Sequence, residues 1–309
     1  MNEVSIGLSH ISSGNRSTFF DNSKSLTNSG TSLNSAGFVY PVPTRRGSFV
    51  IALGYYRQSD FTSGLSFSGF NPNSSIVQSL APDGQSTSNP SGNLAYELWL
   101  ANADSIGPGE FQWDSKILDS VTQSGKVIEG GGLNHVSVSG AFEAAQDLFI
   151  GATLNIITGS YSYNRSYFED DFRNIHNTAP FALASLSLLE TVESDISGFD
   201  AKVGLLYKFA PNSRVGIAFK TPSLVTVRET FSQSGTSDFK APPNQHNSYV
   251  SADQEPNEYD ATTPFVFSGG VSYGIQSLML AADLEYTDWT QMEFRNANSR
   301  LLAFNTQIK

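Results

Sequence analysis

The sequence predicts an all-β fold, a transmembrane antiparallel up-and-down β-barrel. The first observation is that stretches of roughly 15–20 residues alternate apolar and polar side chains, the pattern of strands with one face in lipid. The second is that the connections between these stretches alternate between short and long. Tight hairpins at one end and long loops at the other are typical of outer-membrane barrels, so we expect this chain in the bacterial cell outer membrane.

Nine strands are expected from this alternation. In the stretch 278–286, leucine, alanine and tyrosine side chains share one face, opposite Asp283 and Glu285. Strands of a soluble β-sandwich usually span about 5–6 residues, whereas these are longer and carry charges that suit a water-filled lumen. The predicted strands are 3–20, 32–43, 47–62, 127–143, 147–167, 195–209, 214–231, 261–274 and 278–294.

The whole stretch 1–309 is interpreted as a single, incomplete outer-membrane β-barrel domain, with helical extracellular loops at 63–125 and 168–195. Because 3–20 already forms a strand and 303–309 looks like the start of a tenth, we expect a leader and further strands to lie outside this sequence. Short turns are expected at 43–47, 144–147, 210–213 and 275–277, and long loops at 21–31, 63–125, 168–195, 232–260 and 295–303.

Composition excludes several classes of function. The formal net charge of -11 argues against nucleic-acid binding, which needs clustered Lys and Arg. The absence of cysteine excludes disulfides, thiolate metal sites and cysteine nucleophiles. The histidines show no metal-ligand spacing, so no metal and no cofactor is expected. The acidic long loops are interpreted as solvated faces, with bridging of divalent cations at a lipopolysaccharide surface as the alternative.

Catalytic motifs are weak. Gly270–Gly274 matches the G-x-S-x-G pattern of hydrolases, but it lies in a predicted strand that leads to a tight turn, whereas a nucleophile elbow needs a helix there. His135 and Ser137 share one side of a strand and resemble the dyad of outer-membrane phospholipases, although no third partner accompanies them. A polar pair facing the lumen explains these two residues more simply. We therefore expect no enzymatic activity and no catalytic residue.

The long loops hold the candidate ligand-binding residues. Helices are predicted over 93–104, 114–124 and 180–190, where apolar residues recur at helical spacing between capping and terminating residues. Helices that are apolar nearly all round either form a small cap core or line a groove for an alkyl chain, and both interpretations stay open. The groove would be lined by Leu94, Leu98, Trp99, Phe181, Leu186 and Leu188.

A run of three glycines, Gly130, Gly131 and Gly132, lies within a predicted strand. Consecutive glycines in a strand mark a bulge or kink more often than a phosphate-binding loop when no helix follows. We interpret the run as a kink in the barrel wall.

Three strand–turn–strand segments, 37–55, 204–222 and 263–289, carry a family resemblance. The second reads as strand, turn and strand from Gly204 through Pro211 to Pro222. These segments resemble the outer-membrane long-chain fatty acid and hydrophobic compound transporter family (FadL-like), and the similarity runs over essentially the whole chain. The resemblance implies a monomeric, fourteen-stranded barrel, of which about nine to ten strands are present, without its N-terminal hatch and C-terminal strands.

The same resemblance implies a function. It is passive outer-membrane transport of long-chain fatty acids or other hydrophobic small molecules, which apolar extracellular loop helices capture and pass into the barrel. The implied partners are this cargo (a fatty acid, alkane or aromatic), membrane lipid and lipopolysaccharide. The glycine run would then mark where cargo leaves sideways. The alternatives are a non-transporting surface barrel, such as an adhesin or receptor, and a barrel lipase.

Overall fold

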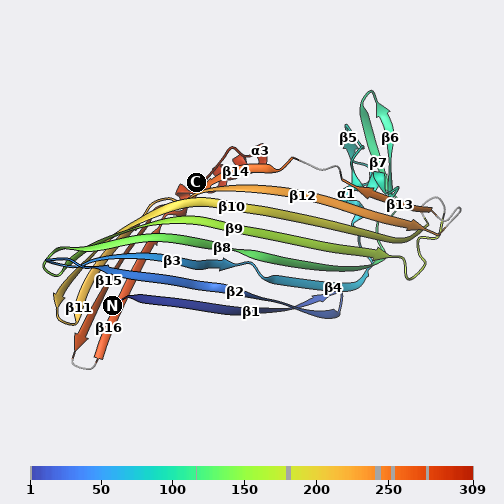
Figure 1. Cartoon of the computed structure of the whole chain (residues 1–309). Helices are drawn as coiled ribbons and strands as arrows, with labels where there is room; N and C mark the ends of the chain where they lie inside the picture. The colour runs from blue at the N-terminus through green and yellow to red at the C-terminus, as the bar shows by residue number, and fades with distance from the viewer. Residues whose placement is uncertain are drawn as a thin grey trace.

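The computed structural model describes residues 2–115, 117–178, 182–240, 245–251, 255–275 and 278–308. Its main sheet is antiparallel, so the expectation of an all-β antiparallel fold is confirmed. Figure 1 shows the strands running lengthwise beside one another as a long, curved sheet. These strands are β1 (Glu3–Phe19), β2 (Asn22–Val42), β3 (Phe49–Asp60), β4 (Ser63–Asn71), β8 (Val121–Ala145), β9 (Leu148–Asp170), β10 (Leu183–Ala210), β11 (Ser213–Lys220), β12 (Leu224–Phe239), β13 (Gln245–Val250), β14 (Asn257–Thr262), β15 (Val266–Ile275), β16 (Leu278–Thr287) and β17 (Glu293–Arg295).

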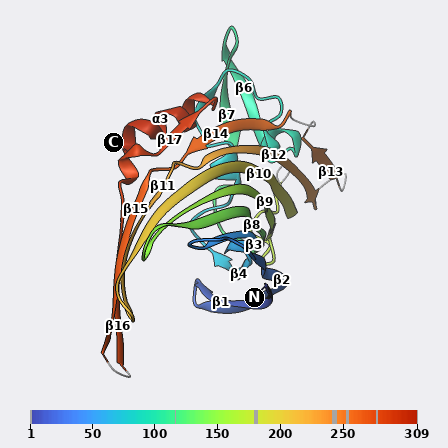
Figure 2. The same ribbon diagram turned by 60° about the vertical axis from the view of Figure 1, so that its left-hand side comes forward.

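The described strands form an open sheet. Along its main path the neighbours run in the order β1-β2-β3-β8-β9-β10-β11-β15-β16, so β1 and β16 are the two ends of this path (Figure 2). In the long-loop half, β12 pairs with β10, β13 and β14, and β14 pairs with β17. The described strands therefore do not show the closed barrel that the sequence predicts. None of the helices built from the described residues has the length and apolar character needed to cross a membrane.

The first hairpin differs from the prediction of a long loop over 21–31. β1 and β2 are joined at Phe20 and Asp21, which both have positive φ, at 44° and 62°. Pairing then continues without a gap from Phe19 opposite Asn22. The residues after the turn are polar on both faces, which favours a loop in sequence terms. The residues 22–31 nevertheless pair with residues 10–19 of β1.

Strand β10 shows why the predicted loop 168–195 is too long. It begins at Leu183, is 28 residues long and pairs with β9 as far as Asp170, the last residue of that strand. The apolar residues of 183–189 therefore belong to a strand, and the predicted helix over 180–190 is wrong. The loop that remains is 171–182.

The other predicted helices are also wrong over most of their length. In the stretch 93–104, helix α2 covers only Leu94–Glu97, and the chain then enters strand β6 (Ala101–Gly107). The stretch 114–124 contains the end of strand β7 (Glu110–Ser115) and the start of β8. These residues pair with neighbouring strands, and that pairing overrides their helical spacing.

Three more helical segments lie outside the predicted ones. Helix α1 (Val77–Leu80) is a single turn, and a 3-10 helix spans Trp289–Gln291. Helix α3 (Ser299–Ile308) replaces the expected tenth strand at 303–309. Its first turn is capped by Asn298, whose side-chain oxygen accepts a hydrogen bond from the Leu301 amide at 3.0 Å.

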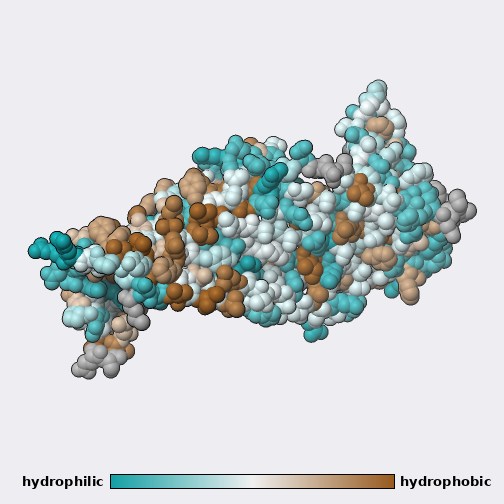
Figure 3. Space-filling view, in the orientation of Figure 1, coloured by the Kyte–Doolittle hydropathy of each residue, from teal (hydrophilic) through white to brown (hydrophobic). Residues whose placement is uncertain are grey.

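We define the outer face of the sheet as the face that carries Val136, Ile156 and Phe199. Its residues change from apolar to polar along one line across the strands. These three residues lie opposite one another on β8, β9 and β10 and are exposed. Toward the short turns, the outward residues stay apolar. Figure 3 shows this apolar band over the short-turn half of the molecule. Toward the long loops, the next outward residues are polar and are again cross-strand neighbours: Asn134, Thr158 and Ser197.

The inner face has the opposite distribution, with polar residues in the short-turn half. In the short-turn half it carries a buried polar chain, in which Ser137 donates to Asn155 at 2.7 Å and Asn155 donates to Asp200 at 2.5 Å. Asp200 also accepts from Ser223 at 2.9 Å and lies 3.2 Å from the Lys220 ammonium. This chain links β8, β9 and β10 to the point where β11 gives way to β12.

Prolines explain two interruptions in the sheet. Pro222 separates β11 from β12, and Pro264 separates β14 from β15. A proline lacks the amide donor that a strand needs. Side chains replace part of the lost pairing, because the Thr221 hydroxyl accepts from the Ala201 amide at 3.0 Å and the Thr263 hydroxyl accepts from the Ser223 amide at 2.8 Å.

The three predicted kink glycines lie in β8, beside the point where β3 ends and β4 begins. Gly131 has a φ of 104°, and its carbonyl accepts hydrogen bonds from the Phe61 amide and the Arg57 side chain. A Cβ atom at Gly131 would lie 2.1 Å from the Ser160 carbonyl oxygen. The backbone therefore requires glycine at this position.

Replacing Gly131 by alanine should destabilise the fold, because the added Cβ collides with backbone and the φ is unfavourable. We expect the free energy of unfolding, measured by chemical denaturation, to fall by about 1–3 kcal/mol. Gly130→Ala is the matched control, since its Cβ would meet only the Ser162 hydroxyl at 3.3 Å. Equal stability of the two variants would contradict this account.

Candidate functional site

The long-loop end carries a separate folded unit, which we name the projecting module (residues 72–120). It contains α1, α2 and a small sheet in the order β5-β7-β6, where β5 is Ser86–Thr87. Figure 1 shows this sheet rising away from the end of the main sheet. The chain leaves at Asn71 and returns at Val121, and these two residues pair directly. The module is therefore an excursion between two adjacent strands.

The apolar residues of the projecting module pack onto the inner face of the main sheet. Four of the six predicted groove residues, Leu94, Leu98, Leu186 and Leu188, are at most 2% exposed in this core. Of the two alternatives that the sequence left open, these four lie in a cap core. Trp99 is different, since it is 62% exposed, and Phe181 lies outside the described residues. The remaining buried members of the core are Val77, Ala81, Ala95, Leu100, Ala101, Trp113, Ile117, Val121, Tyr167, Leu183 and Phe239.

A buried carboxylate, Glu169 on β9, fixes the first part of the module. It accepts hydrogen bonds from the Ser75 hydroxyl at 2.6 Å and the Ile76 amide at 2.7 Å. Gln123 and Tyr167 donate to the same carboxylate at 2.8 Å and 2.6 Å. Burial, followed by the charge of Glu169, raises the pKa of Tyr167, so this phenol stays protonated and able to donate. Four donors compensate the cost of burying this carboxylate.

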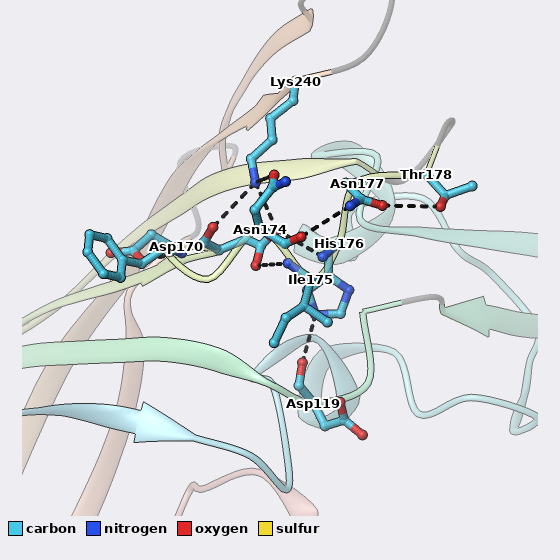
Figure 4. Close-up of polar contacts among 10 residues, drawn as sticks. Asp119, Asp170, Asn174, Ile175, His176, Asn177, Thr178 and Lys240 are labelled. Atoms are coloured by element: carbon cyan, nitrogen blue, oxygen red, sulfur yellow. Dashed lines mark hydrogen bonds and ion pairs between the residues drawn. The ribbon is translucent and has the colours of Figure 1, made fainter.

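A second carboxylate, Asp171, organises the loop after β9, whose residues Asn174, Ile175 and His176 are shown in Figure 4. It accepts from the amides of Ile175 at 2.7 Å and His176 at 2.9 Å, and its side chain is 0% exposed. The Lys240 ammonium lies 2.8 Å from Asp171 and also donates to Asn174 at 2.9 Å. This loop is therefore tied to the segment that follows β12.

The same loop contacts the projecting module. The ring Nε2 of His176 lies 2.8 Å from the Asp119 carbonyl oxygen, at the end of the module (Figure 4). On the opposite side, the Ser237 hydroxyl on β12 donates to the Leu98 carbonyl at 2.6 Å. The module is thus held at several points by strands of the main sheet, and its surface is presented from a rigid base.

Burial works to raise the pKa of Asp171, but the hydrogen bond from Lys240 and those from two backbone amides outweigh it. The pKa of this carboxyl group therefore lies below its ordinary value. A lowered pKa in the folded state means that the charged form stabilises the loop. That stabilisation is complete at neutral pH and is lost as the pH falls through the folded-state pKa.

The exposed surface of the projecting module is partly apolar. Tyr96, Trp99, Ile106 and Leu118 are each at least 39% exposed. Single exposed apolar residues are common, but several on one rigid protrusion are typical of a surface that binds another protein. The available chemistry is recognition, because apolar side chains supply contact area and supply no acid, base or nucleophile.

The two polar residues considered as a catalytic dyad have separate partners. The His135 ring is stacked on Tyr56, whose hydroxyl lies 3.0 Å from Nδ1 of His135. The Ser137 hydroxyl instead donates to Asn155. Among the described residues, no group of three or more histidine, aspartate or glutamate side chains is arranged to hold a metal ion.

These features define an antiparallel all-β protein with an apolar band at one end and a rigid protruding module at the other. A family model described as BamG matches residues 111–309, more than half of the chain, and the chain therefore belongs to the BamG family. This family is connected with the BAM complex, so the protein is associated with the outer membrane. No characterised protein and no solved structure matches the chain.

Membership of the BamG family overturns the FadL-like resemblance and what it implied. Transport of fatty acids or other hydrophobic cargo is wrong as a function, and that cargo is wrong as a partner. The physical reason is that the similar segments encode hairpins with one lipid-like face, such as the β10–β11 hairpin around Pro211. Hairpins of this kind are common to outer-membrane β-proteins and do not specify a transported cargo.

We predict that acid opens the Asp171 loop. Hydrogen exchange of the 172–177 amides, corrected for its intrinsic pH dependence, should show full protection at neutral pH. Protection should fall below about pH 4, once Asp171 accepts a proton. In Asp171→Asn, protection should be weak at every pH. Equal protection of the loop in the two proteins at neutral pH would show that this carboxylate does not hold it.

Proposed function

We propose that this protein is a non-catalytic component of outer-membrane protein assembly. In this proposal its short-turn half is embedded in the outer membrane, and its projecting module binds a partner within the BAM complex. Membership of the BamG family carries the proposal. The apolar band and the anchored module supply the physical means, namely a membrane anchor at one end and a recognition surface at the other.

The dimensions of the apolar band support embedding in the membrane. Outward apolar residues run from Leu148 to Ile156 on β9 and from Phe199 to Phe209 on β10. A tilted strand needs about 9–11 residues to cross a hydrocarbon layer, which matches these rows. Side chains such as Leu154 and Val203, each more than half exposed, would be removed from water by lipid.

Embedding also bears on the two free edges of the sheet. β1 and β16 carry exposed apolar residues, including Val4, Ile6 and Leu284. An unpaired strand edge is costly in hydrocarbon, because its backbone groups have no water to bond. We therefore propose that the sheet is part of a closed transmembrane β-barrel wall. The long-loop end, with its module, would face the outside of the cell.

The proposed function is tested by depletion and by cross-linking in the native bacterium. Depletion should lower the amount of folded β-barrel proteins in the outer membrane. A photo-cross-linking residue at Ile106, which is exposed near the tip of the β6–β7 hairpin, should capture BAM subunits. The control places the same photo-cross-linking amino acid at position 275, in place of Ile275 at the opposite end of the molecule. Normal barrel assembly on depletion would refute the proposed function.

We predict that position along the outer face decides the effect of a charge. Leu154→Arg should lower the free energy of unfolding in lipid by about 2–4 kcal/mol, because the charge enters hydrocarbon. Thr158→Arg lies on the same face of the same strand, beyond the last apolar row, and should cost at most about 1 kcal/mol. Denaturation of the protein refolded into vesicles measures both values. Equal, small effects would mean that the sheet is not embedded.

A further inference from the structure

Helix α2 is closed at both ends by hydrogen bonds. Asn93 caps the start, where its side chain accepts from the Ala95 and Tyr96 amides. At the end, the Trp99 amide donates to the Tyr96 carbonyl at 3.0 Å and the Leu100 amide donates to the Ala95 carbonyl at 2.8 Å. This pair of bonds is the Schellman arrangement, in which the residue after the C-cap, here Leu98, adopts a left-handed backbone.

That left-handed residue is Trp99, with a φ of 59°. Glycine, or sometimes asparagine, normally occupies this position, because a side chain there crowds the backbone. The residues on either side, Leu98 and Leu100, are both 0% exposed and fix the turn in the core. Trp99 itself is 62% exposed. The fold therefore holds a large aromatic side chain in water at a position where glycine would be less strained.

We propose that Trp99 is the anchor through which the projecting module binds a folded protein, whose binding surface has an apolar pocket for Trp99 and is rich in lysine and arginine. This inference rests on the proposed function and names the chemistry of the partner. Tryptophan is the side chain that most often dominates a protein interface, because it offers a large rigid area to a pocket. A rigid base such as the Schellman turn lowers the ordering cost of binding.

Charge indicates the character of the partner's binding surface. The module sequence contains six acidic residues and a single basic residue, Lys116. Of the acids, Asp104 and Glu110 are exposed on strands β6 and β7. A partner with a basic surface would be attracted to the module, and an anionic lipid headgroup would be repelled from it. A protein is therefore favoured over a membrane surface as the occupant.

The experiment compares the full chain with Trp99→Gly and Trp99→Phe. Each protein, purified in detergent, is titrated against the purified BAM complex of the same bacterium prepared without this chain. Trp99→Gly should bind at least about tenfold more weakly, because the anchor is absent, while its denaturation midpoint stays equal or rises. Trp99→Phe keeps an aromatic anchor and the strained backbone, so its affinity should lie between those of the unaltered chain and Trp99→Gly. The double variant Asp104→Asn, Glu110→Gln should also bind more weakly than the unaltered chain. The difference should be largest at low salt, where charge attraction is least screened.

Several results would overturn the inference. Unchanged binding by Trp99→Gly would remove Trp99 as the anchor, although the proposed function would stand. Destabilisation by Trp99→Gly would mean that Trp99 packs within the protein itself. If the three proteins differ in binding to lipopolysaccharide vesicles and not to the BAM complex, the occupant is a membrane. If the unaltered chain does not bind the BAM complex, the proposed partnership and this inference fail together.

Discussion

The structure depends on a boundary that crosses the strands at one level. Val136, Ile156 and Phe199 end the apolar rows of the outer face on three neighbouring strands, and polar residues follow on all three. Side chains alternate between faces with a period of two, so a shift of one residue in any strand would move apolar side chains inward and polar ones outward. The pairing register of β8, β9 and β10 is therefore set by solvent on the outer face and by hydrogen bonds between Ser137, Asn155 and Asp200 on the inner face.

Sequence reasoning was successful where one face differed clearly from the other. The phase of β9 and β10 in the apolar band, with Leu154 outward and Asp200 inward, follows directly from alternation. It failed where both faces are apolar or both are polar. In 183–189, Leu186 and Leu188 point into the core while Leu189 is half exposed, so apolar residues occur on both faces of the strand and the sequence pattern predicts a helix. The residues after Asp21 are polar on both sides, and their pattern predicts a loop.

The candidate site was predictable only in part. The sequence singled out Leu98 and Trp99 as neighbours on one predicted helix, yet the structure gives them opposite roles, one buried and one exposed. The difference arises from a left-handed turn after four helical residues, and no glycine or asparagine marks it. The sequence predicts the carboxylates Glu169 and Asp171 to be solvated loop acids. Their roles depend on donors from distant segments, such as Ser75 and Lys240, which local patterns cannot reveal.

The excursion of the projecting module has a consequence for how the chain folds. Tyr55 on β3 bonds Asn134 on β8 across 79 residues, so joining the first three strands to the others requires closing a long loop. Closing such a loop costs chain entropy and slows folding. A module that folds first brings Asn71 and Val121 together and shortens the loop to be closed. Local hairpins and the module would then form early, and the β3–β8 pairing would follow. Substitutions in the core of the projecting module would therefore slow the pairing of β3 with β8, far from the substituted residues.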